Sequence, residues 1–120
     1  MVPFVGVVDD DQGLCLSLVD LMHAIGYRAE AFRSADALLA SDNLSGFDCI
    51  IADVHMPGRS GIDLIRALYE QGVMTPVILI TALPHMHLDD EATTTGAFCL
   101  LRKPFETNVL LDCIERSLPK

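Results

Sequence analysis

The sequence predicts a single doubly wound α/β domain, and three observations support this prediction. Short apolar segments alternate five times with segments of helical periodicity. The apolar segments at 4–8, 49–52 and 77–80 are continuous, which is typical of parallel strands buried on both faces. A length of 120 residues suits one domain with its own core. We therefore expect residues 1–120 to form one five-stranded parallel sheet covered by five helices.

The composition limits the classes of function. The chain is 51% hydrophobic and 21% charged, as a globular domain is. Its formal net charge of −9 argues against direct binding to nucleic acid or to an anionic membrane, both of which require surplus Lys and Arg. No segment resembles a secretory leader or a membrane span. The four scattered cysteines favour reduced, packed thiols, and we expect a cytoplasmic protein.

Five strands are expected from apolar or alternating segments that end at turn residues or polar residues. The second segment alternates like a strand at a sheet edge, whereas the others are mostly continuous. The five predicted strands are 4–8, 28–32, 47–53, 76–81 and 97–101.

Five helices are expected between and after these strands. The first has apolar residues at helical spacing and a C-terminal stop at Gly26, and the second begins at the N-cap Ser34. The third spans 61–72, the fourth is a polar and weakly helical segment at 87–96, and the fifth spans 106–118. The residues predicted to face the core are Leu14, Leu18, Leu21, Met22 and Ile25 of the first helix, Ile62, Ile65 and either Leu68 or Tyr69 of the third, and Leu110, Leu111 and Ile114 of the last.

Polar residues follow four of the five predicted strands. The first strand is followed by Asp9, Asp10 and Asp11, the third ends at Asp53, the fourth at Thr81, and Lys103 follows the fifth. In open parallel sheets, ligands bind beyond the carboxyl ends of the strands. A strand order of 2-1-3-4-5 would bring these side chains into one pocket.

The chemistry of this pocket suggests phosphoryl transfer. Crowded carboxylates repel one another unless a cation intervenes, and hard oxygen ligands suit Mg²⁺ or Mn²⁺. Asp53 can act as a nucleophile toward phosphorus. Lys103 and the Thr81 hydroxyl can neutralise and hydrogen-bond phosphoryl oxygens. Asp11 is better explained as the N-cap of the first helix.

With these residues at its strand ends, the chain resembles the receiver domains of bacterial two-component response regulators. The motifs that carry the resemblance are VVDDD at 7–11, IIADVHMPGRSGIDL at 50–64, PVILITA at 76–82 and GAFCLLRKPF at 96–105. The separations of 28 residues from Asp53 to Thr81 and 22 from Thr81 to Lys103 match the family. The whole pattern looks most like the nitrogen-fixation regulator subfamily, and it implies a flavodoxin-like fold.

The resemblance implies a role for each residue of the pocket. Asp53 would accept a phosphoryl group from a sensor histidine kinase, with Thr81 and Lys103 contacting that group. Asp9, Asp10, Asp53 and the main-chain carbonyl of His55 would bind Mg²⁺. The bond from Lys103 to Pro104 is expected to be cis. Thr81 and the residue at position 100 would form the conformational switch.

This sequence departs from the family pattern at several positions. The switch position is commonly aromatic and here is Leu100, which leaves the coupled movement with Thr81 open. His55 and Leu83 occupy positions that tune dephosphorylation in the family, and an apolar Leu83 cannot orient an attacking water. The predicted helix at 87–96 is poor helical material.

The implied partners are a sensor kinase, a second copy bound through the face of the fourth helix, fifth strand and fifth helix, and an output domain if the chain is part of a longer regulator. The domain is expected to be a signalling acceptor rather than an enzyme. Three rivals remain: a degenerate receiver acting as an interaction module, a haloacid dehalogenase-type phosphatase using the DxD at 9–11, and a flavodoxin-like binding module. The phosphatase would leave Asp53 without a role, and the binding module lacks a glycine-rich phosphate loop.

Overall fold

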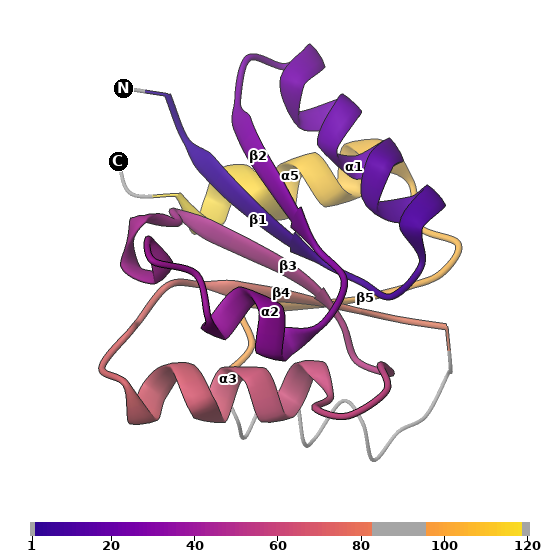
Figure 1. Cartoon of the computed structure of the whole chain (residues 1–120). Helices are drawn as coiled ribbons and strands as arrows, with labels where there is room; N and C mark the ends of the chain where they lie inside the picture. The colour runs from indigo at the N-terminus through magenta and orange to yellow at the C-terminus, as the bar shows by residue number, and fades with distance from the viewer. Residues whose placement is uncertain (1, 83–95, 119–120) are drawn as a thin grey trace.

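The computed structural model describes residues 2–82 and 96–118, and it contains the predicted parallel sheet (Figure 1). The strand order is β2-β1-β3-β4-β5, and all four pairings are parallel. The order predicted from the sequence is therefore confirmed. The strands are β1 (Phe4–Val8), β2 (Arg28–Phe32), β3 (Cys49–Asp53), β4 (Val77–Thr81) and β5 (Cys99–Arg102).

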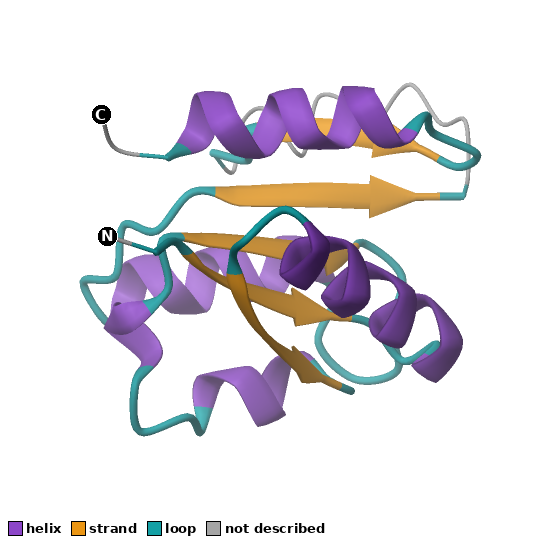
Figure 2. Cartoon of the chain, turned by 90° about the horizontal axis from the view of Figure 1, so that it is seen from above, coloured by secondary structure: helices purple, strands orange, loops and turns teal. Residues whose placement is uncertain are grey.

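In the described residues, three α-helices and a short 3-10 turn lie between the strands, and a fourth α-helix follows β5. They are α1 (Gln12–Ala24), α2 (Ala35–Leu39), η1 (Leu44–Gly46), α3 (Gly61–Glu70) and α5 (Thr107–Ser117). The helix predicted at 87–96 falls almost entirely within 83–95, outside the described residues. Figure 2, viewed from above, shows the helices in two layers on either side of the sheet.

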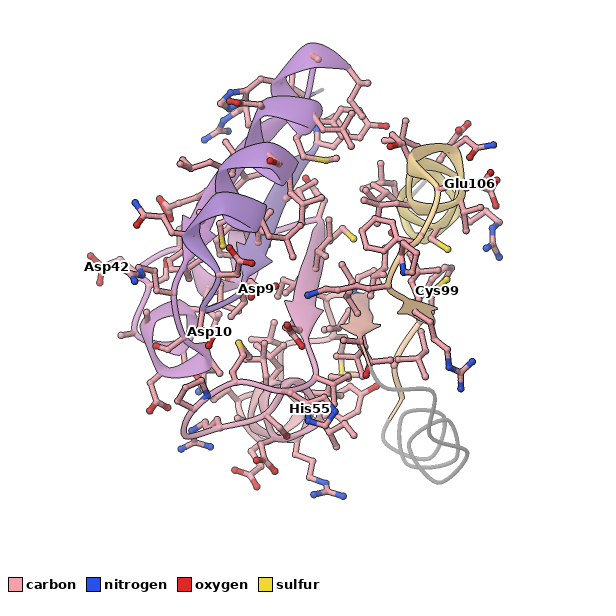
Figure 3. All side chains as sticks on the ribbon, turned by 90° about the vertical axis from the view of Figure 1, so that its right-hand side faces the viewer. Asp9, Asp10, Asp42, His55, Cys99 and Glu106 are labelled. Carbon is pink, nitrogen blue, oxygen red and sulfur yellow. The ribbon has the colours of Figure 1, made fainter. Side chains whose placement is uncertain are left out.

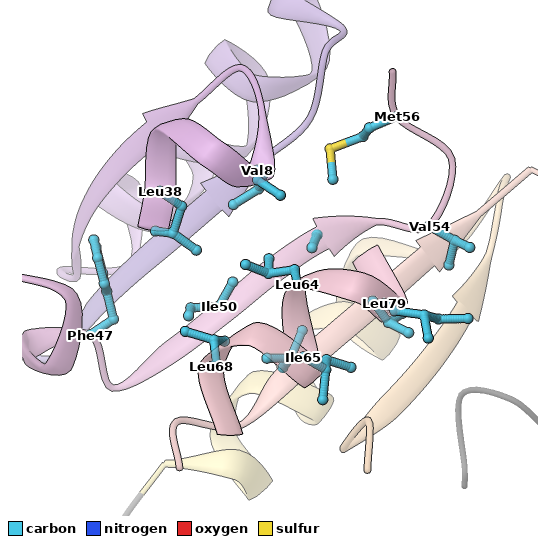
Figure 4. Close-up of a cluster of buried hydrophobic side chains, with 14 of the residues drawn as sticks. Val8, Leu38, Phe47, Ile50, Val54, Met56, Leu64, Ile65, Leu68 and Leu79 are labelled. Atoms are coloured by element: carbon cyan, nitrogen blue, oxygen red, sulfur yellow. The ribbon is translucent and has the colours of Figure 1, made fainter. Parts of the chain in front are cut away.

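Each face of the sheet carries its own hydrophobic cluster. One cluster joins the sheet to α1 and α5 through residues such as Leu18, Met22 and Leu110. The other joins the opposite face to α2 and α3 and includes Leu38, Ile65 and several neighbours (Figure 4). The central strands β3 and β4 are buried along their whole length, because apolar side chains on both faces meet a helical layer.

The helix boundaries follow the predicted caps. The side chain of Ser34 accepts a hydrogen bond from the Ala37 amide at 3.0 Å and begins α2. Gly26 follows the end of α1 with a φ of +90°, a conformation that glycine adopts without a Cβ clash. These local signals depend on a few neighbouring residues, which is why the sequence predicts them well.

One detail of the predicted core was wrong. Ile25 lies just beyond the last helical residue of α1 and is 39% exposed, whereas Cys15, which was not among the predicted core residues, is buried near the start of α1. In α3 the sequence left Leu68 and Tyr69 as alternatives; Leu68 is buried, whereas Tyr69 is 43% exposed and its hydroxyl donates a 3.5 Å hydrogen bond to the Gly96 carbonyl. Periodicity fixes a helical face only to within about one residue, which explains the error at Ile25 and the open choice in α3.

Within residues 2–82 and 96–118, no helix is both long and apolar enough to cross a membrane.

Candidate functional site

The register of the sheet brings the predicted site residues to one edge. Val8 pairs with Ala52, so Asp9 follows β1 at the level where Asp53 ends β3. Thr81 ends β4 opposite Arg102, and Lys103 is the next residue. The backbone amide of Lys103 donates a 2.7 Å hydrogen bond to the Thr81 carbonyl, which joins the last two strand ends. The parallel pairing therefore collects residues from four segments into one site.

Three carboxylates form the centre of this site. One oxygen from each of Asp9, Asp10 and Asp53 lies within 4.8 Å of the other two. Asp9 is 2% exposed and Asp53 is 9% exposed, whereas Asp10 is an exposed residue. Figure 3 looks onto the side of the molecule where the strands end, and Asp9, Asp10 and His55 lie on this side. The cluster is thus open to solvent on the side of Asp10 and closed below Asp9.

Burial changes the acidity of Asp9. The pKa of Asp9 is raised to about 6, mainly by removal from water and also by the nearby charge of Asp53 and a hydrogen bond with Asp10. The Asp11 amide, which donates a 2.9 Å hydrogen bond to Asp9 Oδ1, and the charge of Lys103 act in the opposite direction. The pocket therefore favours a cation or a proton at Asp9.

Lys103 provides the positive charge of the site. Its amine lies 3.3 Å from Asp53 Oδ2 and 3.9 Å from Asp9 Oδ2. The Lys103 side chain is 30% exposed and therefore contacts both the carboxylates and solvent. The following bond to Pro104 is cis, as predicted.

The loop after β3 is fixed to the Asp53 carboxylate. Asp53 Oδ1 accepts a 2.9 Å hydrogen bond from the His55 amide, while the His55 side chain is exposed. Farther along, Ser60 and Asp63 form a capping box that begins α3. Both oxygens of Asp53 consequently have a partner, one from this loop and one from Lys103.

Asp11 caps a helix and is not one of the three carboxylates that form the cluster. Its side chain accepts a 3.1 Å hydrogen bond from the Leu14 amide and caps α1, as predicted. The three consecutive aspartates thus have three environments: one buried in the site, one exposed at the site, and one at the start of a helix.

Thr81 and Leu100 occupy the expected strand positions. Thr81 is fully buried at the end of β4. Leu100 pairs with Leu79 and packs, partly buried, against the cluster beneath α2 and α3. Their proposed switching role remains a prediction. Leu83 lies outside the described residues.

Two residues that support the site were not predicted from the sequence. A Cβ on Gly61 would lie 2.6 Å from the Asp53 carbonyl oxygen, so only glycine permits the start of α3 to approach β3 this closely. The buried Cys15 thiol donates a 3.2 Å hydrogen bond to the Asp9 carbonyl. Gly61 lies eight residues after Asp53 and Cys15 six residues after Asp9, but neither residue type signals such a contact by itself.

The donor set fits a hard divalent cation. Carboxylate oxygens are the ligands that Mg²⁺ and Mn²⁺ prefer, and three of them converge here with one side open to water. The pKa of Asp9 is raised mainly by burial and further by the charge of Asp53, and a cation bound at the site would favour the ionised carboxylate. No thiol or imidazole group takes part in this described cluster, so a soft metal is not favoured.

Comparisons with known proteins agree with this architecture. A family model described as response regulator receiver domain matches residues 5–115. Response regulator protein TodT of Pseudomonas putida is 36% identical over 112 residues, which cover 93% of this chain and 49% of that protein. Transcriptional regulatory protein FixJ of Bradyrhizobium diazoefficiens is 36% identical over 114 residues, which cover 93% of this chain and 55% of that protein. The chain spans about half the length of these curated relatives.

Solved structures show the same fold. Chemotaxis protein CheY4 of Vibrio cholerae superposes with a TM-score of 0.90 at 28% identity, over 98% of this chain and all of that chain (100%). The structure of FixJ-N superposes with a TM-score of 0.88 at 30% identity, over 98% of this chain and 94% of that chain. With the family model matching residues 5–115, the chain belongs to the response regulator receiver domain family.

Proposed function

We propose that the domain accepts a phosphoryl group on Asp53 in a Mg²⁺-dependent step and passes the signal on through altered protein contacts. The observation that supports this most strongly is the position of Asp53. Its carboxylate ends a fully buried strand, has two acidic neighbours within 4.8 Å, and contacts the amine of Lys103 at 3.3 Å. Collecting carboxylates in a buried setting costs free energy, so this cluster is better explained by a bound cation and a phosphoryl group than by stability alone.

In the proposed reaction, an Asp53 oxygen attacks phosphorus, an O–P bond forms, and the N–P bond to the histidine of a sensor kinase breaks. Asp9, Asp10, Asp53 and the His55 main-chain carbonyl would hold Mg²⁺, which when bound neutralises charge on the phosphoryl oxygens. The Lys103 amine, which contacts the Asp53 carboxylate, would then form an ion pair with the phosphoryl group bound to Asp53. The amide of His55 holds the Asp53 carboxylate in place through its 2.9 Å hydrogen bond.

Thr81 and Leu100 are the proposed switch. Thr81 ends the strand next to Asp53, and Leu100 lies on the following strand, so a displaced Thr81 would transmit movement to β5. A leucine can repack as an aromatic residue would, although it offers less surface. We propose that this movement alters the surface formed by β5 and α5, so that a second copy of the chain or an output domain can bind there. We also propose that a sensor kinase is the phosphoryl donor, that the protein acts in the cytoplasm, and that the phosphoryl group is lost slowly from Asp53.

The degenerate interaction module is the remaining alternative. The observation in its favour is Leu100, which lacks the aromatic ring that the switch position commonly carries. The intact set of carboxylates and Lys103 favours phosphorylation, because an interaction module has no need to bury Asp9 and Asp53 beside each other.

The test is the mass of the intact protein after incubation with Mg²⁺ and acetyl phosphate. We expect wild type to gain one labile phosphoryl group and Asp53→Asn to gain none. Asp42→Asn is the matched control, because Asp42 is an exposed aspartate that lies away from the site in Figure 3. A protein that binds Mg²⁺ but gains no phosphoryl group would be an interaction module. A gain that survives Asp53→Asn would identify another acceptor.

A further inference from the structure

Two thiols meet one arginine between β5 and α5. Cys99 is the first residue of β5, and Cys113 lies on α5. Nη2 of Arg116 is 3.9 Å from the Cys99 sulfur and 3.5 Å from the Cys113 sulfur. Because one nitrogen contacts both sulfur atoms, the two thiols are neighbours although 14 residues separate them in the chain.

The two thiols differ in access to solvent. Cys99 is partly exposed, whereas Cys113 is 3% exposed. Figure 3 shows Cys99 on β5, at the side of the molecule that carries α5. Small solutes can therefore reach Cys99 first, and Cys113 lies behind it as a second thiol. A third thiol, Cys49, is fully buried on β3.

The segment between the two thiols carries part of the proposed phosphorylation site. From Cys99 the chain runs through Leu100 and Lys103, passes the cis bond to Pro104, and enters α5. A covalent link between Cys99 and Cys113 would close this segment into a loop. Lys103 and the proposed switch residue would then lie inside a cross-linked ring.

We propose that Cys99 and Cys113 form a reversible disulfide when the protein meets a peroxide, and that this bond restrains the segment carrying Lys103. In the first step the Cys99 sulfur bonds to a peroxide oxygen, the O–O bond breaks, and water leaves with the thiol proton. In the second step the Cys113 sulfur attacks the Cys99 sulfur, the S–O bond breaks, and a second water leaves. Two thiols are oxidised and one hydrogen peroxide is reduced to two waters.

The surroundings of the pair set its reactivity. Burial, and to a smaller extent the neighbouring Cys113 thiol, raise the pKa of Cys99 to about 12, while Arg116 acts in the opposite direction. Only a small fraction of Cys99 is thiolate near neutral pH, so oxidation is slow. The pair therefore responds to sustained oxidant rather than to a brief pulse. Arg116 is the positive group that stabilises the reacting thiolate.

Trypsin separates the four cysteines and makes the pairing directly measurable. Cleavage after Arg102 and Arg116, with the Lys103–Pro104 bond left intact, places Cys99 in peptide 67–102 and Cys113 in peptide 103–116. Cys15 and Cys49 fall in two other peptides. After treatment with hydrogen peroxide and alkylation of free thiols, we expect peptides 67–102 and 103–116 to be linked, and a dithiol reductant to release them.

Variants and a functional measurement complete the test. Cys49→Ala should keep the link, Cys113→Ser should lose it, and Arg116→Met should slow its formation several-fold, with the exposed Arg66→Met as the matched control.

The restraint on Lys103 rests on the proposed phosphorylation, and we expect oxidised wild type to take a phosphoryl group from acetyl phosphate several-fold more slowly than reduced protein. A link between Cys49 and Cys113, or oxidation of Cys99 without any link, would overturn the pairing. Equal phosphorylation of oxidised and reduced protein would overturn the restraint. Because the peptide map involves no phosphoryl group, it stands even if Asp53 is never phosphorylated.

Discussion

The amine of Lys103 lies 3.3 Å from Asp53, although the two residues are 50 positions apart in the chain. The same amine is 3.9 Å from Asp9. One cation therefore faces two buried carboxylates, while a third carboxylate, Asp10, stands at the exposed side of the site. Three carboxylates and one amine leave the site with a net negative charge, which favours a bound cation.

Lys103→Met should have opposite effects on the two proposed activities. Removing a positive charge next to the carboxylates makes the site more negative, so Mg²⁺ should bind roughly tenfold more tightly, about 1–2 kcal/mol. Phosphorylation by acetyl phosphate should become at least about tenfold slower, because the charge that stabilises the phosphoryl oxygens is lost. Calorimetric titration with Mg²⁺ and intact mass against time measure the two effects. Arg66→Met removes an exposed cation outside the site and should change neither.

The stability of the metal-free protein should fall as pH rises through the titration of Asp9. The folded pKa of about 6 lies above the ordinary aspartate pKa of 3.8, so the folded state binds this proton more tightly than the unfolded state. Stability from this group is present at pH below about 4 and is lost as pH rises through about 6, a difference on the order of 3 kcal/mol. Urea denaturation at several pH values, without divalent cations, should show a fall in wild type that is weaker in Asp9→Asn. Parallel pH curves for the two proteins would contradict the assignment.

Mg²⁺ should bind more tightly as pH rises through the same range. A proton and a divalent cation compete for Asp9, and the proton is released when the carboxylate becomes a ligand. We expect the Mg²⁺ dissociation constant to fall between about pH 5 and pH 7 in wild type. Titrations in buffers of different ionisation enthalpy would reveal the released proton. Asp9→Asn should show no proton release from this site.

The adjacent residues Asp10 and Asp11 should separate metal binding from stability. Asp11→Ala removes the N-cap of α1 and should lower the free energy of unfolding by about 1 kcal/mol, while its amide still donates to Asp9. Asp10→Ala removes an exposed carboxylate of the cluster and should weaken Mg²⁺ binding roughly tenfold with little loss of stability. Denaturation and Mg²⁺ titration on both variants check the contrast. Equal effects of the two substitutions on Mg²⁺ affinity would contradict the assignment of Asp10 as a metal ligand and of Asp11 as a helix cap.

Gly61→Ala should destabilise the protein and disturb Asp53. The new methyl group would lie 2.6 Å from the Asp53 carbonyl oxygen and 2.7 Å from Cδ2 of Leu79, and the backbone oxygen cannot move without shifting β3. We expect a loss of about 2–3 kcal/mol in urea denaturation and slower phosphorylation. Gly13→Ala is the matched control within α1, where the new Cβ has only a 3.4 Å contact. That control should be neutral or more stable by up to about 1 kcal/mol.

The sequence predicted the layered fold because its signals are local. Continuous apolar strands, the N-caps Ser34 and Asp11, and the stop at Gly26 each depend on a few adjacent residues. Strand ends follow from the same pattern, so the sequence also predicted that Asp53 and Lys103 would lie near the aspartates that follow β1. The exposure of Ile25 was missed, and the choice between Leu68 and Tyr69 was left open, because helical periodicity leaves the edge of a buried face undefined.

By itself, the sequence determined which residues reach the carboxyl edge of the sheet, since parallel pairing places every strand end on the same side. Only the tertiary structure decided how Asp9 and Asp10 differ, because burial depends on how α1 packs over the end of β1. It also decided the approach of Gly61 to Asp53 and of Cys99 to Cys113. Those contacts join segments that no periodicity connects, and their distances are set by the packing of helices against the sheet.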